Sequence, residues 1–550
     1  MRVIFITGGV ISSLGKGVIT ASIASILEEI GLKVTVLKLD PYLNVDAGTM
    51  NPFEHGEVFV TFDGGETDLD IGHYERFTNI KFSKQNNITS GQIYLEVIEK
   101  ERKGEFLGQT IQVIPHVTNQ IKQKIYSKIK EYDVGIVEIG GTVGDIESLP
   151  FLEAARQIKI EDPQTIFIHI TYVPMAPNTQ ELKTKPTQHS VRELLSIGIQ
   201  PDFILYRTDK NTKISSKNQP TNIKNVTNKI ALFSNLNPKQ VIQIPNLKYI
   251  YQLPFYLLRN KFHKSLLKML KLKIPSKSFI TTKTTKWNKI NLFFCNLRRL
   301  KKVKVGIVGK YTKLKDSYKS LSEALLHSSI HNNLSLEVEW IDSEKLQDSK
   351  IDYTDLKRIF QSVKGIVIAG GFGTRGIEGK IKAIKWAREN NIPTLGICLG
   401  LQLMFIEFVR NVLGLKMANS TEFDPNTPLP VVDLLKNQKN ITNLGGTMRL
   451  GEYLCYVKPN TLAFKVYNTS LITERHRHRY EINLEFLEKY KEELERNGMI
   501  ISGVNPETNL VEIIELKDKA FFLGVQFHPE FNSRVLKPHP LFSFFLSILS

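Results

Sequence analysis

The stretch that decides the fold is residues 3–17, which read VIFITGGVISSLGKG. An apolar run of strand character passes into a glycine-rich turn, and helical periodicity follows at 19–30. Such a loop can direct backbone N–H groups and a helix N-terminus at a phosphate, while Lys16 adds a positive charge. A glycine turn by itself could be purely structural. The strand before it, the helix after it and the lysine together favour a nucleotide-binding loop.

Further apolar runs predict a parallel sheet around this first strand. They lie at 34–38, 134–139, 165–171 and 203–207, and helical patterns such as 117–129 separate several of them. Strands that alternate with helices form parallel sheets covered on both faces.

A second series of strand-like runs begins after residue 300. It comprises 303–308, 365–368, 394–396 and 521–526. The sequence contains no internal repeat, and the two series carry different motifs. We therefore predict an α/β protein with two doubly wound domains, at residues 1–265 and 301–550, joined by a basic linker at 266–300.

The charge of the chain is concentrated in one region. The 550 residues carry a net charge of +18, yet residues 210–315 contain 25 Lys and Arg and no Asp or Glu. The remainder holds 48 basic and 55 acidic residues, which argues against a protein coated with nucleic-acid-binding charge. Within the basic region, residues 255–273 have apolar positions at helical spacing. Such a helix can bind a membrane or a partner, but we favour one that packs its apolar face on the first domain.

Several classes of protein are disfavoured by composition. Three cysteines cannot form a disulfide framework, which favours a reducing compartment. No apolar run approaches the roughly 20 residues that cross a membrane. The N-terminus enters the first strand directly and leaves no room for a signal peptide. We predict a cytoplasmic protein without membrane contact.

The glycine loop departs from the usual phosphate-loop pattern, G-x-x-x-x-G-K-[ST]. Five residues separate Gly9 from Gly15, and Gly17 stands where a Ser or Thr would bind Mg²⁺. The metal then needs oxygen ligands from elsewhere in the chain.

Two carboxylates are candidates for this metal. Asp70 lies in an acidic run, and Glu138 ends a predicted strand. Ligands of open α/β sheets bind outside the carboxyl ends of the strands. Lys38, at the end of the second predicted strand, could add positive charge beside a transferring phosphoryl group.

A different chemistry is indicated in the second half. Residues 396–400 read GICLG, which has the form of a nucleophile elbow around Cys398. His528 can act as the base to this cysteine, and Glu530 can orient the imidazole. The glycines of segment 370–373 can supply backbone N–H donors to an oxyanion. Cys295 and Cys455 have no such neighbours and are predicted to be packing residues.

Long blocks of the sequence resemble the CTP synthase family, from the first strand to about residue 548. The blocks are 8–17, 38–42, 55–60, 66–77, 113–116, 138–153 and 183–191, the last of which reads KTKPTQHSV. The second half also resembles class I glutamine amidotransferases around Cys398, His528 and Glu530. The resemblance implies a dethiobiotin-synthetase-like phosphate-loop domain, fused to a glutaminase domain.

The resemblance implies a ligase that aminates UTP to CTP. ATP phosphorylates the 4-oxygen of UTP with Mg²⁺ as cofactor, and ammonia from L-glutamine, passed between the domains, displaces the phosphate. It further implies activation by GTP through segment 445–451, feedback inhibition by CTP, a homotetramer, and no binding of nucleic acid.

The resemblance also assigns residues to each ligand. ATP would be held by Ser13, Leu14, Gly15, Lys16, Gly17, Val18, Lys38, Asp70 and Leu247, and the metal by Asp70 and Glu138. UTP or CTP would be held by Ser12, Asp145, Ile146, Glu147, Lys183, Thr184, Lys185, Pro186, Thr187, Gln188 and Lys229. Glutamine would be held by Gly371, Leu399, Gly400, Leu401, Gln402, Glu422 and Arg479.

The chain departs from the family pattern at a few positions, and two other interpretations remain open. Phe62 replaces a usual acidic residue, and Asn246-Leu247 replaces the usual Asp-Val near the adenine. One alternative is a related phosphate-loop amidase fused to a glutaminase, as in cobyrinic acid amidation, although the KTKPTQHSV block speaks against it. The other is a basic nucleic-acid-binding or filament scaffold without enzymatic activity. The basic region has few aromatic residues among its lysines, which disfavours that alternative.

Overall fold

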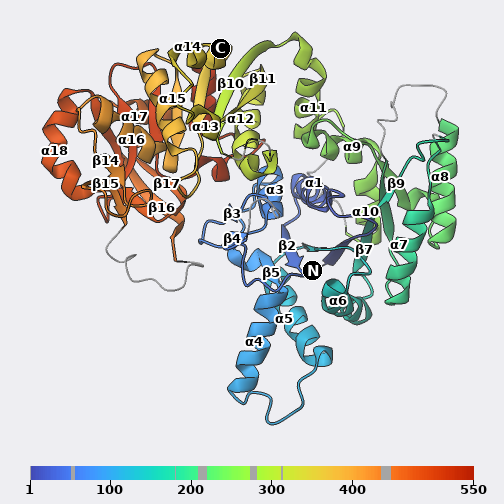
Figure 1. Ribbon diagram of the computed structural model, residues 1–550. Coiled ribbons are helices and arrows are strands. Elements are labelled where there is room, and N and C mark those ends of the chain that lie inside the picture. The colour runs from blue at the N-terminus through green and yellow to red at the C-terminus, as the bar shows by residue number, and fades with distance from the viewer. Residues whose placement is uncertain are drawn as a thin grey trace. The chain divides into compact units, whose positions relative to one another are not determined.

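The computed structural model describes residues 2–50, 56–179, 181–208, 220–272, 282–310, 312, 314–434 and 447–550. The chain divides into two compact units (Figure 1). The first consists of Met1–Ala47 and Asp70–Phe294, and the second of Gly48–Leu69 and Cys295–Ser550. A short segment of the N-terminal half, 48–69, thus folds with the C-terminal half. Nothing in the sequence separates this segment from the domain predicted at residues 1–265.

The first unit is built on a parallel sheet of seven strands, in the order β5-β2-β6-β1-β7-β8-β9. All six pairings between neighbouring strands are parallel, as the sequence predicts. The strands are β1 (Arg2–Gly8), β2 (Val34–Asp40), β5 (Asn87–Thr89), β6 (Val134–Ile139), β7 (Ile166–Val173), β8 (Phe203–Thr208) and β9 (Val241–Ile244).

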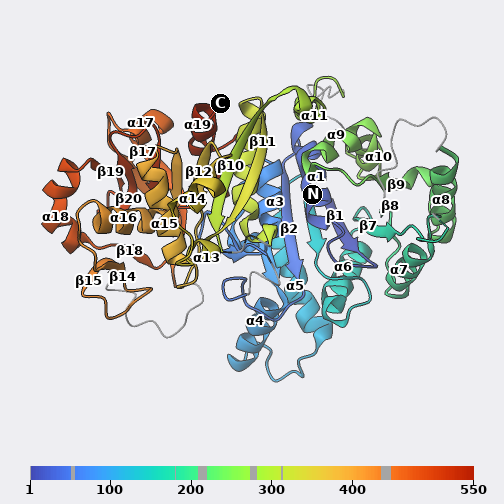
Figure 2. The ribbon, with the colours of Figure 1, turned by 45° about the horizontal axis from the view of Figure 1, so that its top comes forward.

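Helices cover both faces of this sheet, because its strands are apolar on both sides. Val3 and Phe5 of β1 share a core with residues of the helices α5 and α6, such as Ile125 and Leu152. The helices are α1 (Lys16–Glu29), α3 (Leu69–Phe77), α4 (Ser90–Arg102), α5 (Thr118–Ile129), α6 (Leu149–Glu161), α7 (Lys185–Ser196), α8 (Pro220–Phe233), α9 (Leu253–Arg259), α10 (Phe262–Met269) and α11 (Lys286–Asn296). α4 and α5 lie side by side near the β5 edge (Figures 1 and 2).

The amphipathic region predicted as one helix at 255–273 forms two. α9 ends at Arg259 and α10 begins at Phe262, because Lys261 takes the left-handed conformation with φ 59°. Leu258 and Leu266 are buried in the first unit, and Phe262 packs edge-on against Phe203 of the sheet. The expected packing on the first domain is therefore confirmed. Residues 273–281 lie outside the described part of the chain.

The second unit is built on a sheet of nine strands, in the order β11-β10-β12-β13-β21-β20-β19-β16-β17. The pairs from β11 to β21 are parallel and the others antiparallel. The strands are β10 (Lys301–Gly309), β11 (Leu334–Asp342), β12 (Gly365–Ile368), β13 (Thr394–Ile397), β16 (Arg449–Val457), β17 (Leu471–His478), β19 (Met499–Val504), β20 (Val511–Leu516) and β21 (Phe522–Val525). Figure 2 shows β10, β11 and β12 next to one another.

Two hydrophobic cores lie on opposite faces of this sheet. Ile366 and Ile368 of β12 pack with α15 and α16, while Val367, between them, packs with α12 and α19. The helices are α12 (Lys319–His331), α13 (Ser343–Leu346), α14 (Tyr353–Phe360), α15 (Ile377–Glu389), α16 (Leu399–Asn411), α17 (Leu462–Tyr467), α18 (Leu484–Arg496) and α19 (Pro540–Ile548). The predicted α/β fold class is confirmed in both halves.

Smaller elements complete the second unit. One small sheet joins β14 (Ala418–Ser420), β15 (Leu429–Leu434) and β18 (Tyr480–Ile482). A hairpin of β3 (Phe59–Val60) and β4 (Glu66–Thr67) forms within the segment 48–69. Among the described residues, no helix is both long and apolar enough to cross a membrane.

Candidate active sites

The glycine loop ends where α1 begins, at Lys16. Gly15 precedes the helix in the left-handed conformation, with φ 84°. The Nζ of Lys16 donates to the carbonyl of Gly141 at 2.7 Å, beyond the end of β6. A Cβ on Gly8 would lie only 2.8 Å from Cδ of Lys16, so the lysine stem runs along bare backbone. Burial, and secondly the charge of Lys38, lower the pKa of Lys16.

Lys38 gathers the two predicted metal ligands around its ammonium group. It is the neighbour of Glu138 in the pairing of β2 with β6, and its Nζ lies 3.1 Å from Oε1 of that residue. It also donates to Oδ2 of Asp70, at the N-terminal end of α3. A third carboxylate, Asp40, has Oδ1 at 3.8 Å from the same Nζ. Tyr74, which sequence reasoning missed, donates to Oε2 of Glu138 at 2.7 Å.

The three carboxyl groups around Lys38 differ in the direction of their pKa shifts. Burial raises the pKa of Glu138, and it also raises that of Asp40. Burial opposes the charged form of Asp70 as well, but the charges of Lys38, His73 and Lys16 and the hydrogen bond from Lys38 together lower its pKa to about 2. Asp70 is therefore the firmest negative charge beside the loop, and its oxygens are the strongest candidates for a cation.

The structure explains why glycine stands at position 17 instead of the usual Ser or Thr. A Cβ at this position would lie 2.0 Å from Oδ1 of Asp70. The missing side chain therefore leaves room for the carboxylate at the start of α1. The chain exchanges a hydroxyl ligand on the loop for a carboxylate from α3.

The residues present fit Mg²⁺ bound with nucleotide. Among the described residues, no group of three or more His, Cys, Asp or Glu could hold a metal ion alone. Mg²⁺ usually keeps several waters and binds through one or two carboxylates together with substrate phosphates. Asp70 and Glu138, which already share one ammonium group, supply that number of hard oxygen ligands.

An apolar cavity of about 80 Å³ opens beside the loop. It is lined by Leu14, Gly15, Val18 and Leu247, which the family resemblance assigns to ATP, and by residues that it does not assign. Among these is Arg207, whose Nη1 donates to the carbonyl of Leu14 at 2.9 Å and whose Nη2 lies 3.3 Å from Oδ1 of Asn246. Of the two varied positions, Leu247 lines the cavity, and Asn246 contacts it through Arg207.

The predicted UTP segment begins α7 next to the glycine loop. A Cβ on Gly9 would lie 1.6 Å from Oγ of Ser190 on α7, so the loop and the helix are in close contact. Thr187 is buried and donates to the carbonyl of Tyr172, while Gln188 donates to Oγ1 of Thr184 at 2.9 Å. Lys185 and Ser12 are exposed.

The other predicted uridine contacts lie around this segment. Lys183 is exposed and pairs with Glu181 at 2.5 Å, and the charge of Lys229 also acts on that glutamate. The exposed turn 145–147 follows Gly144, where a Cβ would lie 3.9 Å from Cγ of Glu193 on α7. The first unit therefore brings the predicted segments to one region. Among the described residues, no hydrogen bond joins 145–147 to 183–188.

In the second unit, Cys398 occupies a sharp turn between β13 and α16. Its φ of 55° and ψ of −107° are rare for a residue with a side chain, and such strain is typical of functional positions. The flanking glycines are required by close packing. A Cβ on Gly396 would lie 2.4 Å from Sδ of Met404, and a Cβ on Gly400 would lie 2.4 Å from the carbonyl of Ile368.

His528 and Glu530 form a pair next to this cysteine. Nδ1 of His528 lies 2.7 Å from Oε1 of Glu530. Burial would lower the pKa of His528, but the charges of Glu530 and Cys398 and their hydrogen bonds raise it to about 10. The arrangement therefore holds an imidazolium beside the sulfur.

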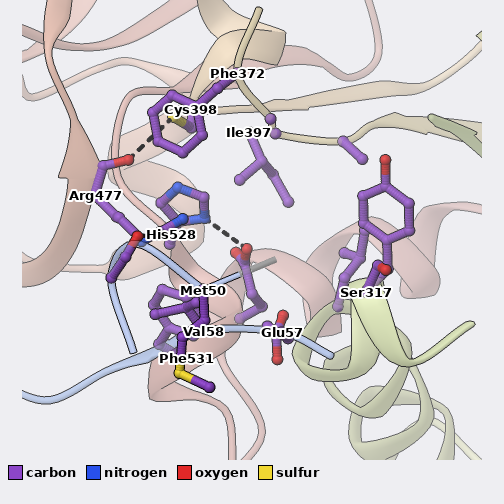
Figure 3. A pocket seen from close by; sticks show the side chains of 17 residues that line it. Met50, Glu57, Val58, Ser317, Phe372, Ile397, Cys398, Arg477, His528 and Phe531 are labelled. Atoms are coloured by element: carbon purple, nitrogen blue, oxygen red, sulfur yellow. Dashed lines mark hydrogen bonds and ion pairs between the residues drawn. The ribbon is translucent and has the colours of Figure 1, made fainter. Parts of the chain in front are cut away.

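A cavity of about 320 Å³ opens at these residues (Figure 3). Its wall includes Cys398, His528 and Arg477, whose carbonyl lies 3.9 Å from Sγ of Cys398. Gly48, Met50, Glu57 and Val58 supply part of the same wall. The sequence does not predict this contribution, because these residues lie far from the glutaminase motifs along the chain.

The loop after β12 passes close to the cysteine. A Cβ on Gly370 would lie 3.6 Å from Cβ of Cys398, and Gly371 has a φ of 148° that strongly favours glycine. The N–H of Gly373 donates to Oε1 of Glu422 at 2.7 Å. Among the described residues, no hydrogen bond is formed by the N–H of Gly371 or Leu399. Both are therefore available as donors to a ligand.

The residues predicted to hold glutamine occupy different environments. Gly371 lines the cavity, while Leu399, Leu401 and Gln402 are buried in the first turn of α16. Nε2 of Gln402 donates to the carbonyl of Tyr480, the residue that follows Arg479. Gly400 contributes close packing, as described above. Segment 445–451, predicted to respond to GTP, lies partly outside the described residues.

Comparisons with known proteins match both halves of the chain. The family described as CTP synthase N-terminus matches residues 2–272, and the family described as Glutamine amidotransferase class-I matches residues 313–548. A curated "CTP synthase" of Hydrogenobaculum sp. (strain Y04AAS1) is 54% identical over 99% of this chain and 97% of its own length. That of Aquifex aeolicus (strain VF5) is 53% identical over 99% and 98%, respectively.

A solved structure is also similar to the second half. It is described as "Trypanosoma brucei CTPS - glutaminase domain with bound acivicin" and is 36% identical. The match has a TM-score of 0.41 and covers 45% of this chain and 93% of that one.

Proposed function

Because the chain belongs to the CTP synthase family, we propose that its two clusters of polar residues carry the two half-reactions of UTP amination. The activity itself is that of a glutamine-hydrolysing ligase, which uses ATP, UTP and glutamine to form CTP. The residues proposed for each step rest on the family resemblance and are supported by the geometry of the two units.

The cluster around Lys16 and Lys38 is proposed to activate UTP. The 4-oxygen of a uracil ring is a poor leaving group, and a phosphoryl group from ATP makes it a good one. The N-terminus of α1 and the two ammonium groups stabilise negative charge on the transferring phosphoryl group. When Lys38 contacts phosphate, Asp70 and Glu138 lose part of their charge pairing and gain affinity for a cation.

Asp70 and Glu138 are proposed to hold Mg²⁺ together with the nucleotide. When bound, the metal supplies Lewis-acid stabilisation of phosphoryl oxygens. Tyr74 keeps one oxygen of Glu138 in a hydrogen bond and so fixes the orientation of the carboxylate. Gly17 keeps the start of α1 open to Asp70.

Substrate binding is proposed to use the surfaces around this cluster. The cavity lined by Leu14, Val18 and Leu247 suits an apolar base, with the guanidinium of Arg207 at its edge. Gly15 lines the same cavity, and Ser13, two residues before it, is assigned to ATP by the family resemblance. The assignment of UTP and CTP rests on the segments 183–188 and 145–147, with Ser12 and Lys229.

Cys398 is proposed to attack the amide carbon of glutamine. The oxyanion that forms is met by the N–H groups of Gly371 and Leu399. His528, held as an imidazolium by Glu530, gives its proton to the departing ammonia and then accepts one from the water that releases glutamate. Glu422 and Arg479 are proposed to hold the polar ends of glutamine, Arg479 through its α-carboxylate.

The ammonia released in this way is proposed to attack C4 of the phosphorylated UTP. Activation by GTP, inhibition by CTP and assembly into homotetramers are proposed from the family resemblance. They require ligand-binding and assembly measurements on this chain.

The observation that carries the proposal is the combination of the strained Cys398 with the His528–Glu530 pair, in a unit separate from the lysine and carboxylate cluster. The test follows CTP formation from UTP, ATP and Mg²⁺ with either glutamine or ammonia. Cys398→Ala should lose the glutamine-dependent activity and keep the ammonia-dependent activity. Loss of both activities would contradict the two-site assignment.

Lys16→Ala is the reciprocal variant. It should abolish CTP formation from either nitrogen source and leave basal glutamine hydrolysis intact. CTP formation at the wild-type rate would remove Lys16 from the proposed site.

A further inference from the structure

The second unit contains a buried lysine that no step above uses. Lys380, in the first half of α15, is 1% exposed. Its Nζ donates to the carbonyl of Ala369 at 2.6 Å. Among the described residues, no carboxylate forms an ion pair with it. Burying a cationic side chain without an ionic partner costs free energy, so packing alone does not explain a lysine at position 380.

The hydrogen bond from Lys380 lies at the start of the loop 369–373, which follows β12 and is called the donor loop. Ala369 follows the last residue of β12 and lines the cavity at Cys398. The next two residues are Gly370, where a Cβ would lie 3.6 Å from Cβ of Cys398, and Gly371, which carries a proposed oxyanion donor. Two further contacts fix the far end of the loop: Lys310 donates to the carbonyl of Phe372, and Gly373 donates to Glu422.

The hydrogen bond from Lys380 to the carbonyl of Ala369 also restricts the orientation of the peptide group that joins Ala369 to Gly370, next to Gly371. A peptide group is planar, so holding the carbonyl of Ala369 also fixes the direction of the N–H of Gly370. Glycine has wide conformational freedom, and without an anchor the Gly370-Gly371 segment would sample many orientations. Donors to an oxyanion act only when held close to their productive geometry, within about 10–20°.

We propose that Lys380 is a positioning residue for glutamine hydrolysis, which sets the peptide plane from which the oxyanion-donor loop begins. The proposal deepens the function proposed above and rests on it. The charges around the ammonium group of Lys380 agree with this role. Burial, and secondly Lys310, lower the pKa of Lys380 to about 7, while Cys398 and Glu422 act in the opposite direction. Either protonation form keeps an N–H donor for Ala369.

The same helix offers a matched control. Lys382 also anchors backbone carbonyls, those of Asp348 and Ile351, at 3.1 and 2.9 Å. These carbonyls belong to the segment between α13 and α14, and neither residue lines the cavity at Cys398. A general role of lysine in stabilising α15 would affect both positions, whereas a role in positioning the donor loop affects only Lys380.

The experiment compares Lys380→Met, Lys380→Arg and Lys382→Met in the full-length protein. Methionine keeps most of the side-chain volume and removes the donor. The measurements are kcat and KM for glutamine hydrolysis, ammonia-dependent CTP formation, and the rate at which iodoacetamide alkylates Cys398, followed by mass spectrometry of its peptide. Alkylation uses the same sulfur but forms no oxyanion.

For Lys380→Met we expect kcat to fall by about 10- to 100-fold, a smaller loss than the removal of a direct donor. KM, alkylation of Cys398 and ammonia-dependent activity should stay within about threefold of the wild type. Lys380→Arg should recover at least part of kcat, and Lys382→Met should hydrolyse glutamine at the wild-type rate.

An unchanged kcat in Lys380→Met would overturn the proposal. Parallel loss of hydrolysis, alkylation and ammonia-dependent activity would overturn it too, because it would indicate a general structural role. If Cys398→Ala still hydrolysed glutamine, the underlying function would be wrong. If instead the wild type hydrolyses glutamine, Cys398→Ala does not, and Lys380→Met is unaffected, only the role of Lys380 is wrong.

Discussion

Gly17 lies where a phosphate loop usually has Ser or Thr, and its missing side chain is what allows Asp70 to approach α1. The two residues are far apart in the sequence and meet only because α3 starts beside the loop. A single position therefore decides which group the phosphate-binding region offers to a cation: a hydroxyl on the loop, or a carboxylate from another helix.

Gly17→Ala should reduce CTP formation by at least about 100-fold with either glutamine or ammonia. The new Cβ would lie 2.0 Å from Asp70, so the carboxylate must move. The measurement is the rate of CTP formation at saturating ATP and Mg²⁺. Gly104→Ala is the control for backbone strain: its φ of 76° disfavours alanine, but nothing lies within 4 Å of a Cβ placed there, so CTP formation should stay near the wild-type rate. Wild-type activity in Gly17→Ala would remove Asp70 from the proposed metal site.

Glu530 should control the pH dependence of glutamine hydrolysis. Burial opposes the charged form of His528, yet Glu530 and Cys398 raise its pKa to about 10, above the ordinary value near 6.5. The charged pair therefore contributes to stability fully below about pH 6.5, and the contribution is lost as pH rises towards 10. Glu530→Gln removes one negative charge and should lower the pKa of His528 by about 1–3 units.

The alkaline limb of the kcat profile should accordingly move to lower pH in Glu530→Gln, because His528 must be protonated to release ammonia. Exposed Glu488 provides the control, and Glu488→Gln should leave the profile in place. An alkaline limb at the same pH in Glu530→Gln would contradict the role of the pair.

From the sequence, candidate reacting groups can be named more readily than the residues that support them. Cys398, His528, Glu138 and Lys16 could be proposed because their chemistry is specific and each lies near a predicted strand end or turn. Asp70, in an acidic run, needed the family resemblance as well. The supporting residues, such as Tyr74, Arg207 and Lys380, are ordinary residues of helices and strands in the sequence. Only the tertiary structure shows that each of them contacts a functional group.

Among the elements, β17 joins the catalytic residues of the second unit to the hairpin β3–β4. On one side its backbone contacts the site, since the carbonyl of Arg475 accepts from the N–H of His528 at 2.7 Å. On the other side its arginines hold the hairpin: Arg475 donates to the carbonyl of Val60 at 3.1 Å, and Arg477 to Glu66 at 2.9 Å. Residues two positions apart on a strand point to the same face, which is why both arginine side chains reach the hairpin.

Glu66→Ala should destabilise the second unit. Glu66 is almost fully buried, and removal of one partner of a buried ion pair costs about 3 kcal/mol. For a unit of this size that corresponds to a decrease in Tm of about 6–12 °C, measured by calorimetry. Glu337→Gln, which breaks an exposed pair with Lys302, is the control and should change Tm little. Equal effects of the two changes would show that the Glu66 pair has no special role.

The elements themselves were predicted with uneven success, for physical reasons. Buried parallel strands have continuous apolar runs, and the strands β1, β2, β6 and β8 therefore lie where the sequence predicts them. The break between α9 and α10 was missed because the apolar spacing continues through Lys261, whose left-handed backbone has no signature in the pattern. The hairpin β3–β4 is too short to give a periodic signal.

For the whole molecule, the net charge of +18 proved less informative than its distribution. The residues of the proposed sites lie almost entirely outside the region 210–315 that produces the excess. Within this region, the described residues form parts of the first unit, including β9 and α9 to α11, and the first strand of the second unit. The lysines of these described elements thus belong to ordinary helices and strands.

The exchange of segment 48–69 between the two halves has a topological consequence. The polypeptide passes between the compact units three times, at 47–48, 69–70 and 294–295. A single cut near residue 295 therefore cannot yield two self-sufficient products. The N-terminal fragment would retain a piece of the C-terminal unit, and the C-terminal fragment would lack part of the wall around its own cysteine. Splitting the gene at that point would separate the two sets of motifs without separating the two compact units. Both activities therefore depend on a single uncut polypeptide.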